Sequence, residues 1–452
     1  MEGNLWWSEF VSITEELTAP GDVQVVAVGV SGMGPCVLVT DRDGEPLRPA
    51  ILYGVDTRST LQIERMTARF GASEMLHSCG STLTTQAVGP KLAWLTDHEP
   101  ELMRRARRMY MPSSWLVYKL TGEYALDRHS ASQCTPLFDR SSLSWNEQRA
   151  REIAPWLELP RLAWPADVAG VTREPIGGVG AGVPVIVGTI DAWSESLSVG
   201  AHRPGDLMLM YGTTMFLIAT STEPMQHESM WGTVGVLPGT WNLAGGMSAS
   251  GAITGWIGEL TGGDYAALSD EAAVSGLGAN GLLMLPYFAG ERTPIMDPDA
   301  RGAIVGLTLS HTRGDLYRAA LEATALGVRH NVETMLETGV SIERVVAVGG
   351  GTKSRLWTQI VSDATGLVQE TRDVAIGASY GSAYLAALGI DATADIDAWN
   401  PVSGGVTPRS DTADFYAHRY ELYRSLYAAA APTMHMLAQE DRRAVSSIEG
   451  EL

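Results

Sequence analysis

The sequence has few of the features that mark secreted, membrane-spanning or nucleic-acid-binding proteins. It contains only three cysteines, Cys36, Cys79 and Cys134, which lie far apart and form no C-x-x-C pair. This spacing suggests neither a disulfide framework nor a zinc motif, so we expect three buried thiols. No window reaches the ~18 apolar residues of a membrane span, and the first residues lack the basic and apolar regions of a secretory signal. These absences favour the reducing cytoplasm.

Positive charge is also scarce. The chain has 32 Lys and Arg residues against 52 Asp and Glu residues, a formal net charge of −20 at pH 7. Such a surface repels nucleic acids and anionic membranes, so we expect neither as a partner. A phosphate group would have to be bound locally, by backbone N–H groups, a helix N-terminus or a metal ion.

In contrast, the chain is long and rich in glycine. The 452 residues exceed what one hydrophobic core usually organises, and 49 Gly and 22 Pro indicate many tight connections. A Pro- and Gly-bearing stretch at residues 160–182 marks a boundary between two mixed α/β halves. We therefore predict an α/β protein with an N-terminal domain at residues 1–178 and a C-terminal domain at residues 179–452.

Two short runs rich in β-branched residues predict buried strands that lead to candidate site residues. Residues 23–30 are too few for a helix and continue into Ser31-Gly32-Met33, and residues 184–190 end at Asp191. Ligand sites in α/β sheets gather beyond the carboxyl ends of strands. From the local sequence alone, Asp191 is as good an N-cap for the following helix as it is a functional carboxylate.

Two glycine-bearing turns are candidates for phosphate binding. Gly212-Thr213-Thr214 forms the tip of a predicted hairpin, and its N–H and hydroxyl groups can donate to a polyphosphate, although this motif alone favours an ordinary turn. Gly349-Gly350-Gly351 joins a strand at residues 344–348 to a helical pattern that stops at Gly366. Such a loop lets backbone amides approach a nucleotide, but it is equally consistent with a tight crossover.

Taken in order, these pieces resemble the FGGY family of carbohydrate kinases, a branch of the actin, hexokinase and heat-shock-protein ATPase fold. The strongest match is to the C-terminal signature of that family, from Gly302 to Leu307 and then, after seven residues, from Asp315 to Glu322. The N-terminal signature is half present, because residues 91–98 fit whereas the residues just before Lys91 depart from it. The resemblance extends over residues 6–423.

The resemblance implies two ribonuclease-H-like domains that bind ATP, Mg²⁺ and a sugar in the cleft between them. By this similarity Asp191 is the catalytic base that takes the proton of the acceptor hydroxyl. The nucleotide site is assigned to Gly212, Thr213, Thr214, Gly349, Gly350, Gly351 and Ser354, and the sugar pocket to Ser31, Gly32, Met33, Asp56 and Arg58. A ketopentose such as xylulose or ribulose is the favoured substrate, although Gly34 replaces a sugar-contacting His that many xylulose kinases carry.

One expected element of the family has no counterpart in the sequence. In FGGY kinases a strand and hairpin with an Asp-x-Gly-Thr motif precede a segment that resembles residues 2–7. We therefore expect an N-terminally truncated first domain, through a start codon placed too late or a real shortening, with an exposed sheet edge or apolar face. A real shortening predicts a catalytically impaired sugar- or nucleotide-binding protein. A homodimer is the general expectation for such an enzyme.

Overall fold

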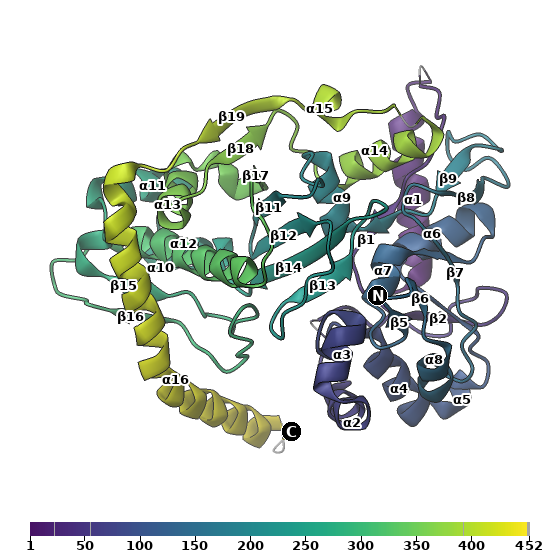
Figure 1. Cartoon of the computed structure of the whole chain (residues 1–452), viewed down its shortest axis with the longest axis horizontal. Helices are drawn as coiled ribbons and strands as arrows, with labels where there is room; N and C mark the ends of the chain where they lie inside the picture. The colour runs from purple at the N-terminus through teal and green to yellow at the C-terminus, as the bar shows by residue number, and fades with distance from the viewer. Residues whose placement is uncertain (22, 55, 392, 450–452) are drawn as a thin grey trace. The chain divides into compact units, whose positions relative to one another are not determined.

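The chain forms two compact units, neither of which is continuous in sequence (Figure 1). The computed structural model describes residues 1–21, 23–54, 56–391 and 393–449. Unit 1 comprises Met1–Pro204, Thr220–Leu243 and Val374–Pro401, and unit 2 comprises Gly205–Ala219, Ala244–Asp373 and the chain from Val402 onward. The α/β class expected from the sequence is confirmed, and the division into continuous domains at residue 178 stays a prediction.

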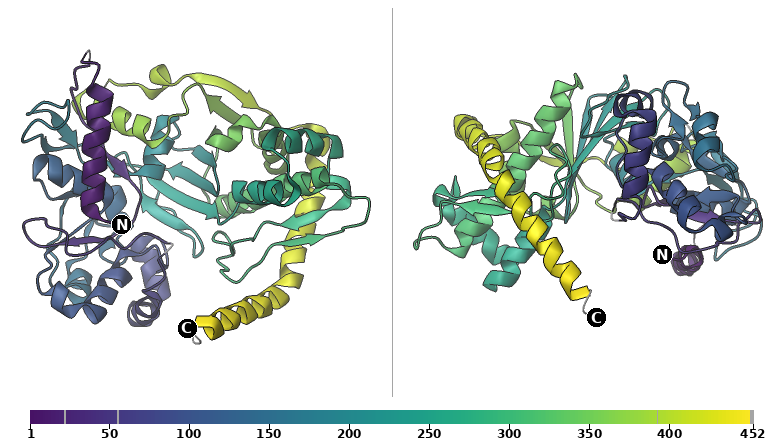
Figure 2. Two further views of the ribbon diagram at one scale, coloured as in Figure 1. Left: turned by 180° about the vertical axis from the view of Figure 1, so that it is seen from behind. Right: turned by 90° about the horizontal axis from the view of Figure 1, so that it is seen from below.

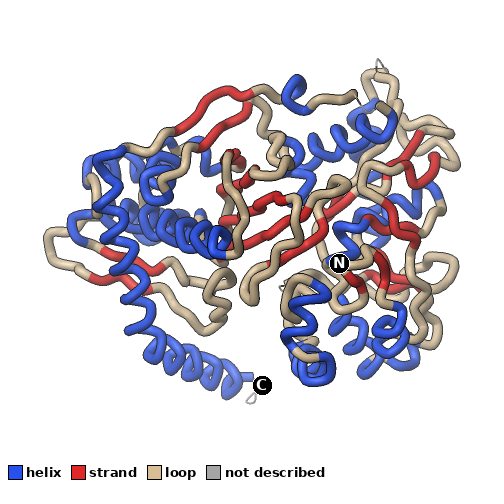
Figure 3. Tube along the Cα trace, viewed as in Figure 1, coloured by secondary structure: helices blue, strands red, loops and turns tan. Residues whose placement is uncertain are grey.

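Unit 1 consists of short strands between helices and long connections (Figure 3). Its helices are α1 Gly3–Thr18, α2 Thr60–Phe70, α3 Ala72–Cys79, α4 Val88–His98, α5 Pro100–Met103, α6 Pro112–Thr121, α7 Arg128–Ser132, α8 Glu147–Ile153, α9 Asp191–Ser198, α14 Ala378–Ile390 and α15 Ile396–Trp399. Its strands are β1 Ser31–Gly32, β2 Leu38–Thr40, β3 Arg108–Tyr110, β4 Ala125–Asp127, β5 Phe138–Asp139, β6 Ser144–Trp145, β7 Arg161–Ala163, β8 Val168–Val171, β9 Pro184–Ile186, β10 Thr189–Ile190 and β13 Trp231–Val234.

The core of unit 1 forms where parallel segments meet helix α6. Val28 bridges to Val185 in parallel, and β1 pairs in parallel with β10. Val28 and Val30 are buried in one cluster with Val117 and Leu120 of α6. Apolar side chains at spacings of two along a strand and three along a helix bring such faces together.

The strand predicted at residues 23–30 is only partly formed. Val28 makes an isolated bridge and the regular strand begins at Ser31. Val23 and Val26 are 55% and 58% exposed, so the β-branched run is not buried along its whole length. The prediction of a fully buried strand is therefore wrong for its first half, because β-propensity alone does not supply a neighbouring strand.

Unit 2 is built around a mixed sheet and one long buried helix. Its helices are α10 Gly251–Thr261, α11 Tyr265–Ser275, α12 Arg313–Glu337, α13 Arg355–Thr365 and α16 Ala413–Glu449, with 3₁₀ turns η1 Ala279–Gly281, η2 Gly350–Lys353 and η3 Ser410–Thr412. Its strands are β11 Asp206–Tyr211, β12 Met215–Ser221, β14 Trp241–Met247, β15 Leu283–Leu285, β16 Ala303–Val305, β17 Arg344–Val348, β18 Gln369–Arg372 and β19 Val402–Val406.

The sheet has the strand order β13-β14-β12-β11-β17-β18-β19. Strands β11 and β12 are antiparallel and pair Tyr211 with Met215, so the predicted hairpin is confirmed. Strand β17 runs parallel to β11 and pairs Val348 with Met210. The carboxyl ends of β11 and β17 therefore lie at the same edge of the sheet, where ligands of α/β proteins usually bind.

Two helices of unit 2 show how the local sequence sets their limits. Thr312 and Asp315 form a reciprocal capping box at the start of α12, whose following residues are almost all buried. Helix α16 contains Pro432 and bends along its length (Figure 2), as expected where a proline removes an N–H donor. No described helix is both long enough and apolar enough to cross a membrane.

Candidate active site

Asp191 and the Ser31–Met33 loop come together in unit 1 through strand pairing. The parallel register of β1 and β10 pairs Ser31 with Thr189 and Gly32 with Ile190. Asp191 follows Ile190 directly and is the first residue of α9. Because β1 and β10 run in parallel, their carboxyl ends lie at the same end of the strand pair, and the two predicted site segments are therefore close together.

Two glycines allow this close approach of backbone and side chains. A Cβ atom on Gly34 would lie 2.8 Å from the Ile190 side chain, and one on Gly32 would lie 2.7 Å from Pro112. A larger residue at position 34 would push on the side chain of Ile190, the residue that directly precedes Asp191. The absence of a His at this position thus has a steric consequence as well as a chemical one.

The Asp191 carboxylate is held by its own helix start and by no described side chain. Its Oδ1 accepts a hydrogen bond from the Ala192 N–H at 2.8 Å. Burial raises the pKa of Asp191, and hydrogen bonds from backbone N–H groups partly oppose this shift. The N-cap of α9 is Ile190, so Asp191 does not have the N-cap role that was the alternative interpretation. A carboxylate with a raised pKa is a better proton acceptor than an ordinary aspartate.

Glu195 places a second carboxylate one helical turn after Asp191. Burial raises the pKa of Glu195, and the charge of Asp191 adds to the shift. Carboxylate oxygens are the ligands that Mg²⁺ takes from proteins, usually one or two together with phosphate oxygens and water. Asp191 and Glu195 fit that donor set. Within the described parts of the chain, no group of three or more His, Cys, Asp or Glu side chains could hold a metal ion.

Asp56 and Arg58 form an ion pair with each other. Arg58 Nε donates to Asp56 Oδ1 at 2.8 Å, and its guanidinium lies 4.8 Å from the centre of the Trp94 ring. Burial alone would raise the pKa of Asp56, but the hydrogen bonds and charge of Arg58 and the charge of Lys91 outweigh it and lower the pKa. The pair lines a shallow depression with Leu52 and Thr57.

Sequence reasoning missed a small cavity in unit 1 that is lined in part by Pro35. Its lining is dominated by hydroxyl and amide groups and comprises Pro35, Ser81, Thr82, Thr84, Gln86, Ala87, Ser132, Gln133, Thr135, Trp231 and Thr233. Buried Lys91 supports this lining by donating to the Gln86 carbonyl at 3.2 Å. Burial lowers the pKa of Lys91 to about 8. The departure from the N-terminal signature just before Lys91 was the signal for Gln86.

The two glycine-bearing turns lie side by side in unit 2. Gly212 N donates to the Thr214 carbonyl at 3.0 Å and closes the hairpin tip, whose Thr213 is exposed. A Cβ atom on Gly349 would lie 2.5 Å from the Tyr211 carbonyl oxygen, which directly precedes this tip. The parallel pairing of β11 and β17 therefore brings together two motifs that lie more than a hundred residues apart.

The three glycines of the second turn differ in what they require. Gly349 has φ of +96°, and a Cβ atom on Gly351 would lie 2.7 Å from the Trp357 ring, whereas one on Gly350 would meet nothing within 4 Å. Ser354 caps α13, because its hydroxyl accepts the Trp357 N–H at 3.3 Å. Three of these four residues thus have structural tasks, and exposed Gly350 stays open to an approaching ligand.

Sequence reasoning also missed Ser250 and Gly251, which join the hairpin tip to helix α10. Ser250 N donates to the Thr213 carbonyl and Gly251 N donates to the Gly212 carbonyl, each at 3.0 Å. A Cβ atom on Gly251 would lie 2.6 Å from the Gly212 carbonyl oxygen. The positive end of the α10 dipole therefore lies against the candidate phosphate-binding turn. The Ser-Ala-Ser-Gly stretch before an apolar helical pattern was the available signal.

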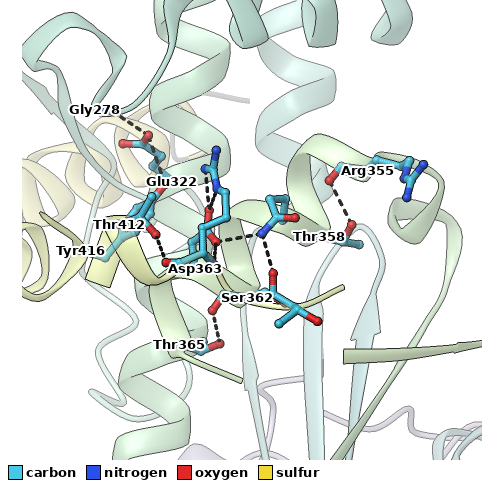
Figure 4. A network of polar contacts seen from close by, with 12 residues as sticks. Gly278, Glu322, Arg355, Thr358, Ser362, Asp363, Thr365, Thr412 and Tyr416 are labelled. Carbon is cyan, nitrogen blue, oxygen red and sulfur yellow. Dashed lines mark hydrogen bonds and ion pairs between the residues drawn. The ribbon is translucent and has the colours of Figure 1, made fainter. Parts of the chain in front are cut away.

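Helix α13, which follows the glycine turn, is anchored at its far end by a polar network (Figure 4). Asp363, whose side chain is fully buried, accepts hydrogen bonds from Arg409 Nη2 at 2.6 Å and from Gln359 at 2.8 Å. Thr358 donates to the Arg355 carbonyl at 3.2 Å. These contacts fix the helix whose N-terminus follows Gly349–Gly351.

The fold is that of the two-domain ATPases related to actin and hexokinase, a class whose enzymes use ATP as a phosphoryl donor. More narrowly, the chain belongs to the FGGY family of carbohydrate kinases: residues 2–198 match the N-terminal domain of that family, and residues 207–390 match its C-terminal domain. The family resemblance expected from the sequence is confirmed. The chain is thus a sugar phosphotransferase that uses ATP and acts on a small-molecule sugar.

The chain is similar to family members of several named activities. The chain is 26% identical over 416 residues to a xylulose kinase of Staphylococcus xylosus, covering 89% of this chain and 86% of that protein. It is 27% identical over 418 residues to a gluconokinase of Bacillus subtilis (strain 168), with coverages of 84% and 78%. The crystal structure of xylulose kinase from Rhodospirillum rubrum is similar with a TM-score of 0.89 at 30% identity, over 96% of this chain and 91% of that chain.

Proposed function

We propose that the protein transfers the γ-phosphoryl group of ATP to a hydroxyl of a ketopentose such as xylulose or ribulose, with Asp191 as the general base. One observation carries this proposal. The pairing of β1 with β10 brings the half-buried Asp191, which directly follows Ile190, close to the Ser31–Met33 loop, so an acceptor bound at that loop would lie near a proton acceptor. A general base must be within reach of the proton that it removes.

The chemistry of unit 1 supports a neutral, hydroxyl-rich acceptor. Ser, Thr and Gln side chains gather near Pro35 around a cavity with room for about one water molecule, and side chains of this kind recognise hydroxyl groups through directed hydrogen bonds. Relatives named xylulose kinase support a ketopentose. The gluconokinase relative at similar identity is the reason to include an acidic sugar in any test.

In the proposed reaction, the acceptor oxygen forms a bond to the γ-phosphorus as the bond from that phosphorus to the β,γ-bridging oxygen breaks. Asp191 takes the hydroxyl proton, and ADP leaves with the electron pair of the broken bond. Phosphoryl transfer needs little covalent help and much positioning. The Gly212–Thr214 and Gly349–Gly351 turns of unit 2 would hold the phosphates. When bound, Mg²⁺ would neutralise negative charge on the phosphates, with Glu195 as the carboxylate that would hold it.

The test is ADP release coupled to NADH oxidation, with Mg-ATP and a panel of ketopentoses, hexuloses, polyols and gluconate. We expect release that depends on one class of ketopentose. Release on gluconate or glycerol alone would contradict the substrate class but not the phosphotransferase activity. Sugar-dependent thermal stabilisation without ADP release from any acceptor would favour the sugar- or nucleotide-binding protein and remove the proposed role of Asp191.

Three further expectations belong to this proposal. The continuous domains 1–178 and 179–452 predict that limited proteolysis cuts first near residue 178. A homodimer predicts twice the chain mass of 48.4 kDa in light scattering. A cytoplasmic location predicts that the protein fractionates with cytoplasmic enzymes of its host.

A further inference from the structure

The backbone at residues 246–251, from the end of β14 to the start of α10, makes two sets of hydrogen bonds in unit 2. In one set, the hairpin tip accepts hydrogen bonds from Ser250 N and Gly251 N. The other set comes from the loop between β15 and β16, whose residues 291–293 contact residues 246–248. The position of the tip therefore depends on how well this second loop holds the segment.

Glu291 is the centre of the second contact. Its Oε1 accepts hydrogen bonds from Ser248 N at 2.6 Å and from Arg292 N at 2.8 Å. Arg292 in turn donates to the Met247 carbonyl at 2.7 Å. Glu291 is only 4% exposed, so these backbone N–H groups have no ready replacement from solvent.

Thr293 also binds this segment, and Asn331 binds Thr293. Thr293 Oγ1 accepts the Gly246 N–H at 2.6 Å and donates to Asn331 Oδ1 at 2.5 Å, and both side chains are fully buried. Asn331 belongs to α12, the long buried helix of unit 2. The loop is thus fixed to the rigid centre of the unit and can transmit that rigidity to residues 246–251.

We propose that Glu291 is a positioning residue for nucleotide binding: it fixes Ser248, and through Ser250 and Gly251 it holds the Gly212–Thr214 turn in place. This inference rests on the proposed function of that turn. Glu291 touches no reacting group in this assignment. It keeps the turn ordered before the nucleotide binds, so that binding does not have to supply the free energy of ordering the turn.

The protonation of Glu291 suggests the best control substitution. Burial raises its pKa to about 7, and hydrogen bonds from Ser248 and Arg292 partly oppose the shift. The charge of Arg292 also opposes it, and the phenols of Tyr287 and Tyr423 lie nearby. A neutral glutamine can accept the same N–H groups and has nearly the same shape, so Glu291→Gln should keep the hold and Glu291→Ala should lose it.

The experiment measures Mg-ADP affinity by calorimetry for wild type, Glu291→Ala, Glu291→Gln and the control Glu259→Ala, which changes an exposed glutamate on α10. We expect Glu291→Ala to weaken Mg-ADP by about 10-fold to 100-fold, as for loss of a hydrogen bond to a charged group. Glu291→Gln and Glu259→Ala should stay near wild type. KM for ATP should rise in parallel, while KM for the sugar and kcat at saturating ATP change little.

Amide hydrogen exchange gives a readout that does not depend on activity. In Glu291→Ala, residues 246–252 should exchange faster than in wild type, and in Glu291→Gln they should not. If wild type binds Mg-ADP and Glu291→Ala binds it equally well, the positioning role is wrong and the proposed function stands. If wild type binds no nucleotide, both are wrong. Faster exchange across all of unit 2 would show a general folding defect and would also overturn a specific positioning role.

Discussion

At the scale of single residues, Asp191 carries the sharpest prediction. Asp191→Ala removes the proposed proton acceptor, so kcat should fall by about 10²-fold to 10⁴-fold while KM for the sugar changes little. Asp43→Ala, which alters an exposed aspartate of the same unit, is the matched control. The measurement is sugar-dependent ADP release. An unchanged kcat in Asp191→Ala would exclude the base role.

The raised pKa of Asp191 also predicts the shape of the pH–rate profile. Burial shifts this carboxyl upward, so it becomes protonated at a higher pH than an ordinary aspartate. A protonated carboxyl cannot accept the hydroxyl proton, and kcat should therefore fall as the pH is lowered through this raised pKa. A kcat that is constant down to the pKa of a free aspartate would contradict the assignment.

A matched pair of glycines tests the backbone of the second turn. Gly349→Ala places a Cβ atom 2.5 Å from a carbonyl oxygen at φ of +96°, whereas Gly350→Ala meets nothing within 4 Å. We expect Gly349→Ala to lower the free energy of unfolding by about 1–3 kcal/mol, and Gly350→Ala to change it by no more than about 0.5 kcal/mol. Urea unfolding followed by tryptophan fluorescence measures both. Equal effects would mean that packing does not require glycine at position 349.

At the scale of elements, helix α13 depends on an ion pair at its far end. Arg409→Ala leaves the fully buried Asp363 carboxylate with fewer donors, although Gln359 and the Arg409 N–H still bind it. Loss of a partner for a buried charged group costs about 1–3 kcal/mol of unfolding free energy. Arg355→Ala, at an exposed position of the same helix, should have almost no effect. Thermal unfolding distinguishes the two, and similar melting temperatures would show that the pair contributes little.

Each unit of the molecule carries a buried histidine that links stability to pH. Burial lowers the pKa of His129 to about 4 and that of His330 to about 3. Folded-state pKa values below the unfolded value of 6.5 mean that the unfolded chain binds more protons. Stability from these groups is present above pH 6.5 and is lost as the pH falls toward 3–4. Buried Asp127 and Glu291, with pKa values raised to about 6 and about 7, act in the opposite direction.

Difference measurements separate these opposing contributions. His330→Gln should reduce the slope of unfolding free energy against pH between 6.5 and 4 by up to about 1.4 kcal/mol per pH unit. His77→Gln, at an exposed position, should leave the slope unchanged. Urea unfolding at several pH values gives both slopes. A slope in His330→Gln equal to that of wild type would mean that His330 titrates normally in the folded protein.

Across these scales, motif residues were predictable from the sequence where local chemistry is specific. The hairpin tip at Gly212–Thr214 and the strand–glycine–helix unit fold as predicted. The single strand predicted at residues 184–190 is divided at Val187 and Gly188 into β9 and β10, although Asp191 still follows its end. The sequence also determined the family, because ordered signatures survive at low identity. It overestimated the strand at residues 23–30, since β-propensity does not provide a partner strand.

What only the tertiary structure decided are contacts between segments far apart in the chain. Gly349 lies against Tyr211, Glu291 holds Ser248, and Lys91 supports a polar pocket that includes Trp231. None of these contacts has a local periodicity or a cap that a sequence pattern could reveal. Register between parallel strands and the packing of loops are set by the whole core. The sequence by itself therefore determined the family and its motifs, and the tertiary structure decided which residues hold those motifs in place.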